Sequence, residues 1–97
     1  MKYLVVDASL NGTGVRDYYR GGYVCLDSLK LSEELKTQLR IWLSKYENAH
    51  YDGFLDQDLT NKLDKEGKEI AANIKKELVN IKIDYFSDAK MTKDFIA

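Results

Sequence analysis

The sequence of 97 residues predicts a small α/β (α+β) domain, a two-layer sandwich in which two helices pack on a short sheet of two to four strands. Two long segments with apolar residues at helical spacing indicate the helices. An apolar run precedes them and an alternating segment follows them, so the expected order is strand, loop, helix, helix, strand. The length suits a single domain over residues 1–97, and no linker or repeat divides the chain.

The first strand is predicted over "KYLVVDA" (Lys2–Ala8), an apolar run without alternation that is typical of a central strand covered on both faces. "SLNGTG" ends this strand, because Asn11 and Gly12 tolerate the positive φ of a turn. In the next segment, "VRDYYRGGYVCL", Gly21 and Gly22 interrupt strand-forming residues. This segment fits a loop, a loose hairpin or a short edge strand, and it is the candidate source of a third strand.

The first helix is predicted over "LSEELKTQLRIWLSKYENA", with Ser32 as N-cap and with Glu33 and Glu34 in the first turn, where the helix dipole favours carboxylates. Its apolar residues fall on one face. They are Leu35, Leu39, Trp42, Leu43, Tyr46 and Ala49.

The second helix is predicted over "DLTNKLDKEGKEIAANIKKELVN", whose apolar stripe comprises Leu59, Leu63, Gly67, Ile70, Ala71, Ile74 and Leu78. A glycine inside a helix costs about 1 kcal/mol relative to alanine. Gly67 on the stripe therefore indicates close approach by the first helix or the sheet, with a merely tolerated glycine as an equal alternative. "VNIKIDYFS" alternates as a strand with one apolar face, and the tail "DAKMTKDFIA" stays unassigned.

Composition and charge restrict the class of protein. The formal net charge is −1, so no basic face is indicated and we expect no direct contact with nucleic acid. The single cysteine, Cys25, rules out an intrachain disulfide and fits a reducing cytoplasm; we expect it to be buried and inert. The apolar run at the N-terminus is too short for a signal peptide or a membrane span. These features predict a soluble, cytoplasmic protein without a membrane partner.

The sequence gives little evidence for a metal-binding site or for a catalytic triad. His50 is the only histidine, which disfavours a catalytic zinc site and a Ser-His-Asp triad. The acidic window after Tyr51 fails the calcium-loop register, because Asn61 stands where a loop starting at Asp56 needs glycine. We therefore expect no enzyme activity, no cofactor and no metal.

Asp7 is the residue on which an enzymatic alternative depends. "VVDASLNGTG" resembles the first strand and turn of ribonuclease H-like proteins, in which an aspartate at this place binds a catalytic metal. The resemblance covers about a tenth of the chain, and the predicted strands are too few for that fold. A metal-dependent nuclease-like or phosphoryl-transfer protein centred on Asp7 is the alternative function, and a self-associating regulatory module is the second alternative.

Two clusters combine aromatic and charged residues in the manner of protein interfaces. One comprises Tyr18, Tyr19 and Arg20. The other comprises Tyr51, Asp52, Phe54, Asp56 and Asp58, in a window from Lys45 to Lys62 that holds no other Lys or Arg. Carboxylates around aromatic side chains suit a basic partner. We predict both clusters as partner-binding surfaces, while an equal alternative places some of the tyrosines in the core and the acids in a solvated loop.

The chain resembles immunity proteins of bacterial contact-dependent growth inhibition systems, which are polymorphic toxin systems. The segments that carry the resemblance are "GVRDYYRGGYV", "LSEELKTQLRIWLSKYENAHYDGF", "LDKEGKEIAANIKKEL" and "IDYFSDAK". The resemblance implies tight binding to one cognate toxin domain, often a nuclease, whose active site or substrate surface is blocked. It implies a monomer that forms a heterodimer with the toxin.

Overall fold

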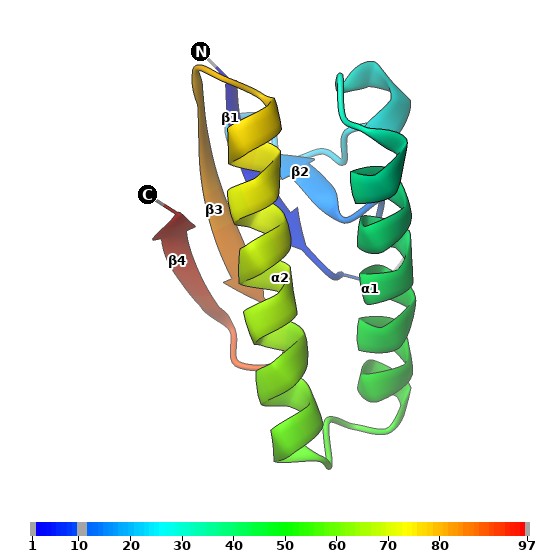
Figure 1. Cartoon of the computed structure of the whole chain (residues 1–97). Coiled ribbons are helices and arrows are strands. Elements are labelled where there is room, and N and C mark those ends of the chain that lie inside the picture. Colours follow the sequence, from blue (N-terminus) through cyan, green and yellow to red (C-terminus); the bar gives the residue numbers. More distant parts are fainter. Residues whose placement is uncertain (1, 10–11, 97) are drawn as a thin grey trace.

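The computed structural model describes residues 2–9 and 12–96 and confirms the predicted fold class. Two helices pack on a four-stranded sheet in the chain order strand, strand, helix, helix, strand, strand (Figure 1). The elements are β1 (Lys2–Asp7), β2 (Val15–Asp17), the 3-10 helix η1 (Leu26–Ser28), α1 (Glu33–Tyr51), α2 (Gln57–Glu77), β3 (Ile81–Ser87) and β4 (Thr92–Ile96).

The sheet has the strand order β2-β1-β3-β4. β1 and β3 are parallel neighbours, with Lys2 opposite Ile81 and Asp7 opposite Phe86, and the two helices form the crossover between them. The edge strands β2 and β4 each run antiparallel to the neighbouring central strand. The loops that follow β1 and β3 therefore leave the sheet at the same end, the C-terminal end of the two parallel strands.

Both helices lie on the same side of the sheet (Figure 1). The core lies between the two layers, where alternate strand residues meet the apolar faces of α1 and α2. Its largest fully buried side chains include Trp42 and Tyr46 from α1, Ile70 from α2, and Tyr85 from β3. The predicted helical faces are thus confirmed, except that Leu59 at the start of α2 is exposed and that Leu43 and Leu78 are half-buried.

Gly67 lies at a close approach of all three core elements. A Cβ atom at this position would stand 2.3 Å from the Tyr85 ring and 2.8 Å from the Trp42 ring. The prediction of a close approach is confirmed, and the contact involves both the first helix and the sheet.

A buried carboxylate in α2 joins the helices to the sheet. Asp64 accepts hydrogen bonds from the hydroxyl groups of Tyr46 at 2.9 Å, Tyr85 at 2.6 Å and Ser87 at 2.9 Å. The Nζ of Lys90 lies 3.7 Å from the same carboxylate. Burial raises the pKa of Tyr46 to about 12 and also raises the pKa of Tyr85, so both hydroxyls remain donors at neutral pH.

The segment that the sequence left open forms both an edge strand and a hairpin. β2 ends at Asp17, whose backbone N–H donates to the carbonyl of Gly22, and Arg16 pairs with Tyr23 on the returning chain. The predicted turn at Asn11 falls outside the described residues. The unassigned tail forms β4, which pairs with β3.

Cys25 is exposed, so the expectation of a buried thiol is wrong. The chain leaves the short β2 hairpin there and has not yet entered the core, which it reaches one residue later at buried Leu26. Within the described residues, neither helix is long and apolar enough to cross a membrane.

Candidate protein-binding surface on the helix layer

The connection between α1 and α2 is a tight turn held by local hydrogen bonds. The backbone N–H of Phe54 donates to the carbonyl of Ala49 at 2.9 Å, and that of Gly53 donates to the carbonyl of His50 at 2.9 Å. Gly53 and Phe54 have φ values of 72° and 55°, the left-handed conformation that commonly ends a helix. The turn therefore presents its side chains on a fixed backbone.

Two large apolar side chains project from this turn into solvent. Leu55 is 86% exposed and Tyr51 is 72% exposed, and Leu59 in the first turn of α2 is exposed beside them. Scattered exposed apolar residues are common, but adjacent ones at a rigid turn are typical of an interaction surface. We call Tyr51, Leu55, Leu59 and the acids Asp52, Asp56 and Asp58 the α1–α2 tip.

The charges of the tip are of one sign. Asp52, Asp56 and Asp58 are all exposed, and no Lys or Arg occurs between Lys45 and Lys62. Asp56 also has a structural role, because its carboxylate caps α2 by accepting from the backbone N–H of Leu59 at 3.0 Å. Of the three acids of the tip, Asp56 caps α2, and Asp52 and Asp58 face solvent.

Phe54 differs from the other predicted contact residues at this end. It is half-buried, and its ring packs against Tyr46 with ring centroids 5.7 Å apart and against His50 at 5.5 Å. It therefore anchors the turn, while Leu55 and Leu59, which the sequence reasoning missed, provide the exposed apolar area. Leu59 lies four residues before Leu63, so helical spacing predicts that it is buried on the same stripe. It is exposed because the first turn of α2 projects past the sheet.

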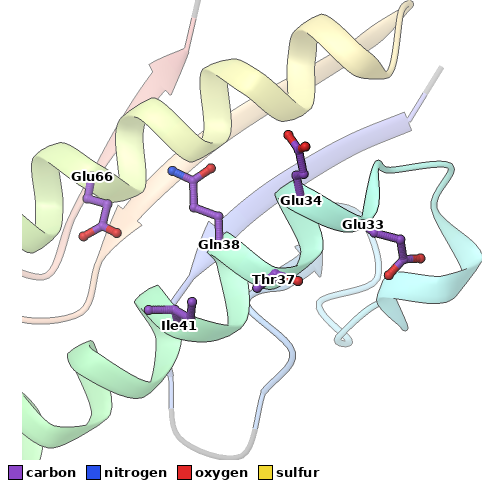
Figure 2. A pocket seen from close by; sticks show the side chains of 6 residues that line it. All are labelled: Glu33, Glu34, Thr37, Gln38, Ile41 and Glu66. Carbon is purple, nitrogen blue, oxygen red and sulfur yellow. The ribbon is translucent and has the colours of Figure 1, made fainter.

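A separate groove lies beside the first half of α1, with Glu66 of α2 on its other side, and two of its carboxylates, Glu33 and Glu66, pair with Lys36 and Lys45. It has a volume of about 560 Å³ and is lined by Glu33, Glu34, Thr37, Gln38, Ile41 and Glu66. Figure 2 shows Gln38 and Glu34 extending from α1 toward α2, with Glu66 on the opposite wall. Ile41 is 51% exposed and provides an apolar contact within this acidic rim.

The second predicted cluster lies at the other end of the sheet. The backbone N–H of Tyr18 donates to the carbonyl of Tyr3, so Tyr18, Tyr19 and Arg20 lie beside the start of β1. The α1–α2 tip lies beyond the end of β3, where His50 approaches Asp88. The longest dimension of the molecule is 37 Å, and the structure does not bring the two clusters together.

Asp7 lies at the end of β1 and is buried among groups of its own chain. One carboxylate oxygen accepts from the backbone N–H of Ser9 at 2.7 Å and from its hydroxyl at 2.5 Å. The other oxygen lies 3.1 Å from the Nε of Arg16. A cation at Asp7 would have to compete with this guanidinium, so the contacts favour a structural role for Asp7.

Asp88 approaches the same place from the end of β3, with its carboxylate 3.4 Å from the Ser9 hydroxyl and 3.9 Å from the Nδ1 of His50. Within residues 2–9 and 12–96, no three His, Cys, Asp or Glu side chains are grouped so as to hold a metal ion. The hydroxyl of Ser9 lies between the carboxylates of Asp7 and Asp88, and Arg16 lies beside Asp7.

Comparison with known proteins yields no relative from which a function can be transferred. No family model matches this chain, and no curated protein has a significantly similar sequence. The choice of function therefore depends on the surfaces described above.

Proposed function

We propose that this protein is an immunity protein that binds and neutralises a cognate toxin domain through the α1–α2 tip. The observation that carries the proposal is the exposure of Leu55 and Tyr51 on a rigid turn among uncompensated carboxylates. Apolar anchors inside a charged rim are the usual arrangement of a binding hot spot. The resemblance in sequence layout supplies the class of partner.

A basic partner suits this surface. The carboxylates of the tip attract a positively charged surface and speed its encounter, while the apolar side chains resist dissociation. A nuclease domain has such a surface where it binds phosphates. Occupation of that surface by the tip would exclude the nucleic acid from the toxin.

The proposal predicts that an open reading frame directly upstream of this gene encodes a toxin domain, and that domain is the partner used in the test. Coexpression should protect the host from the toxin, and the two proteins should copurify as a complex with one copy of each. Failure of both protection and copurification contradicts the immunity function itself.

The position of the interface is tested by two separate changes in the tip. The triple variant Asp52→Asn, Asp56→Asn, Asp58→Asn removes the charges but keeps an N-cap at position 56, because asparagine caps helices as well as aspartate does. We expect it to slow association at least severalfold at low salt and to reduce the salt dependence of the rate. Leu55→Ala should instead speed dissociation about tenfold, since it removes a contact residue of the interface.

Asp27→Asn is the matched control, because Asp27 is an exposed acid in η1, outside the tip. It should leave both rates unchanged in surface plasmon resonance. If the triple variant and Leu55→Ala bind the toxin as the unmodified protein does, the tip is not the interface, even where protection is observed.

A further inference from the structure

The face of the sheet opposite the helices is a second surface, and none of the described elements covers it (Figure 1). The strand registers place alternate residues of all four strands on it. The face comprises Tyr3, Val5, Asp7, Arg16, Lys82, Asp84, Phe86, Lys93 and Phe95. The turn after β2 adds Tyr18, Tyr19 and Arg20, and we call the whole the open sheet face.

The carboxylates of the open sheet face are buried and used within the chain. Asp84 is only 3% exposed, accepts a hydrogen bond from the Tyr3 hydroxyl at 2.8 Å, and lies 3.9 Å from the Nζ of Lys93. Asp7 faces Arg16, as described above. Nearby Asp17 accepts from two backbone N–H groups of its own turn. The charge that this face presents to solvent is therefore mainly that of its cations.

Those cations surround the middle of the sheet. Lys82 and Arg20 are exposed, and Lys93 reaches across the face to lie 4.8 Å from the centroid of the Tyr18 ring. Arg16 lies on the edge strand β2. Arg16 and Lys93 lie beside the buried carboxylates Asp7 and Asp84, so four cations and two carboxylates leave this face an excess of two positive charges.

Aromatic rings lie among these cations. Tyr18 stacks on Tyr3 with ring centroids 4.0 Å apart, and Tyr19 meets both rings edge-on. The hydrogen bond to Asp84 raises the pKa of Tyr3 to about 12, so its ring remains neutral. Tyr19 is 69% exposed and Phe95 is 57% exposed, which leaves ring area free at both sides of the sheet.

Rings and cations with this placement match the chemistry of a single-stranded nucleic acid. The two rings lie at separate places on the face, Tyr19 beside Tyr3 of β1 and Phe95 on the edge strand β4, where the Nζ of Lys75 lies 5.4 Å from its ring centroid. Bases stack on exposed aromatic rings without regard to sequence, and Lys and Arg between the rings neutralise phosphates. An acidic protein would use the cations but has no need of two separated exposed rings.

We propose that the open sheet face binds single-stranded nucleic acid, with bases stacked on Tyr19 and Phe95 and phosphates contacted by Lys82, Lys93 and Arg20. This is a second activity, independent of toxin binding at the α1–α2 tip. It also differs from the expectation drawn from the net charge, because a net charge of −1 for the whole chain does not show where the charges lie.

The test measures fluorescence anisotropy of labelled 12-nucleotide oligouridylate and oligothymidylate with the full chain. We expect dissociation constants in the micromolar range at 50 mM NaCl. With about three phosphates neutralised and a slope of about −0.7 for each, log affinity should fall with log salt at a slope of about −2. Affinity should therefore drop more than tenfold between 50 and 200 mM NaCl.

Two surface variants separate stacking from charge. Tyr19→Ala should weaken binding about tenfold with the salt slope unchanged, whereas Lys82→Gln should reduce the slope by about 0.7. Tyr51→Ala is the matched control, since it removes an equally exposed tyrosine at the α1–α2 tip, and it should change neither quantity. Circular dichroism establishes that each variant is folded.

Three results would overturn the proposal: no binding of either oligonucleotide at 200 µM protein in 50 mM NaCl, binding that Tyr19→Ala leaves unchanged, or binding of polyglutamate in preference to both oligonucleotides. The last would identify an acidic protein as the occupant. Equal affinity for the two oligonucleotides supports recognition by stacking and backbone charge, and a preference for oligouridylate supports additional contacts to the 2′-hydroxyl.

Discussion

Gly67 illustrates how a single residue sets the distance between the helix layer and the sheet. The rings of Trp42 and Tyr85 occupy the space that a side chain at this position would need. A bulkier residue would have to displace two buried aromatic rings that form the largest part of the core. The glycine is therefore retained for packing despite its low helix propensity.

Gly67→Ala is expected to lower the free energy of unfolding by about 1–3 kcal/mol, because overpacking outweighs a propensity gain of about 1 kcal/mol. Urea denaturation followed by circular dichroism measures the change. Lys65→Ala, at an exposed position of the same helix, is the control and should stay within about 0.5 kcal/mol. A stabilised Gly67→Ala protein would show that the rings move aside at little cost.

Each helix begins at a capping side chain, and the cap of α1 also joins the two helices. Ser32 accepts from the backbone N–H of Leu35 at 3.2 Å and donates its hydroxyl to Glu77 at 2.8 Å, so the start of α1 is bound to the end of α2. Asp56 caps α2 directly after the α1–α2 turn. The backbone of the tip is therefore fixed on both sides, by the end of α1 before it and by the capped start of α2 after it.

Asp56→Ala is expected to destabilise the protein by about 1 kcal/mol, whereas Asp56→Asn should be nearly neutral, because asparagine provides the same acceptor. The free energies of unfolding from urea denaturation decide between them. Equal losses in the two variants would mean that the charge of Asp56 at the helix N-terminus stabilises α2, and not its hydrogen bond.

The network around Asp64 connects α1, α2, β3 and the turn after it, so the protonation state of its two tyrosines affects contacts between all of these elements. The pKa of Tyr46, about 12, lies above the value of about 10 for an unfolded tyrosine, and that of Tyr85 is also raised. The unfolded chain therefore loses these protons at lower pH than the folded protein. The stability that the two hydroxyls contribute is complete below pH 10 and decreases as the pH rises above it.

We expect the free energy of unfolding to fall between pH 10 and pH 12 by about 1.4 kcal/mol per pH unit for each of the two tyrosines. Urea denaturation at half-unit intervals of pH measures this slope. Tyr46→Phe should be less stable at pH 8, because Asp64 loses a donor, but its slope above pH 10 should be shallower. An unchanged slope in Tyr46→Phe would show that other groups control alkaline unfolding.

At the scale of the whole molecule, the protein has two chemically different sides. The helix layer carries the acidic groove and the α1–α2 tip, and the open sheet face carries aromatic rings and exposed cations. The near-zero net charge conceals this division. A toxin domain and a nucleic acid could therefore be bound at the same time, at surfaces on different layers.

The types of the main elements, the N-cap of α1 and the fold class were predictable from the sequence, because each depends on local spacing and propensity, whereas the close approach at Gly67 was one of two equal alternatives. It also located the acidic tip, since its charges are contiguous in the chain. β4 was not identified, because its five residues include one strand-breaking acid and are stabilised by pairing with β3.

Only the tertiary structure decided which side chains these surfaces present. Leu59 is exposed although it continues an apolar stripe, while Asp7 and Asp84 are buried although they are charged. Whether a residue is exposed depends on which residues, distant in the sequence, lie beside it. For Asp7 and Asp84 these neighbours follow from the parallel pairing of β1 with β3. The tyrosines after β2 became part of a larger face because the pairing of β2 with β1 and of β1 with β3 brings them within reach of Lys93 of β4.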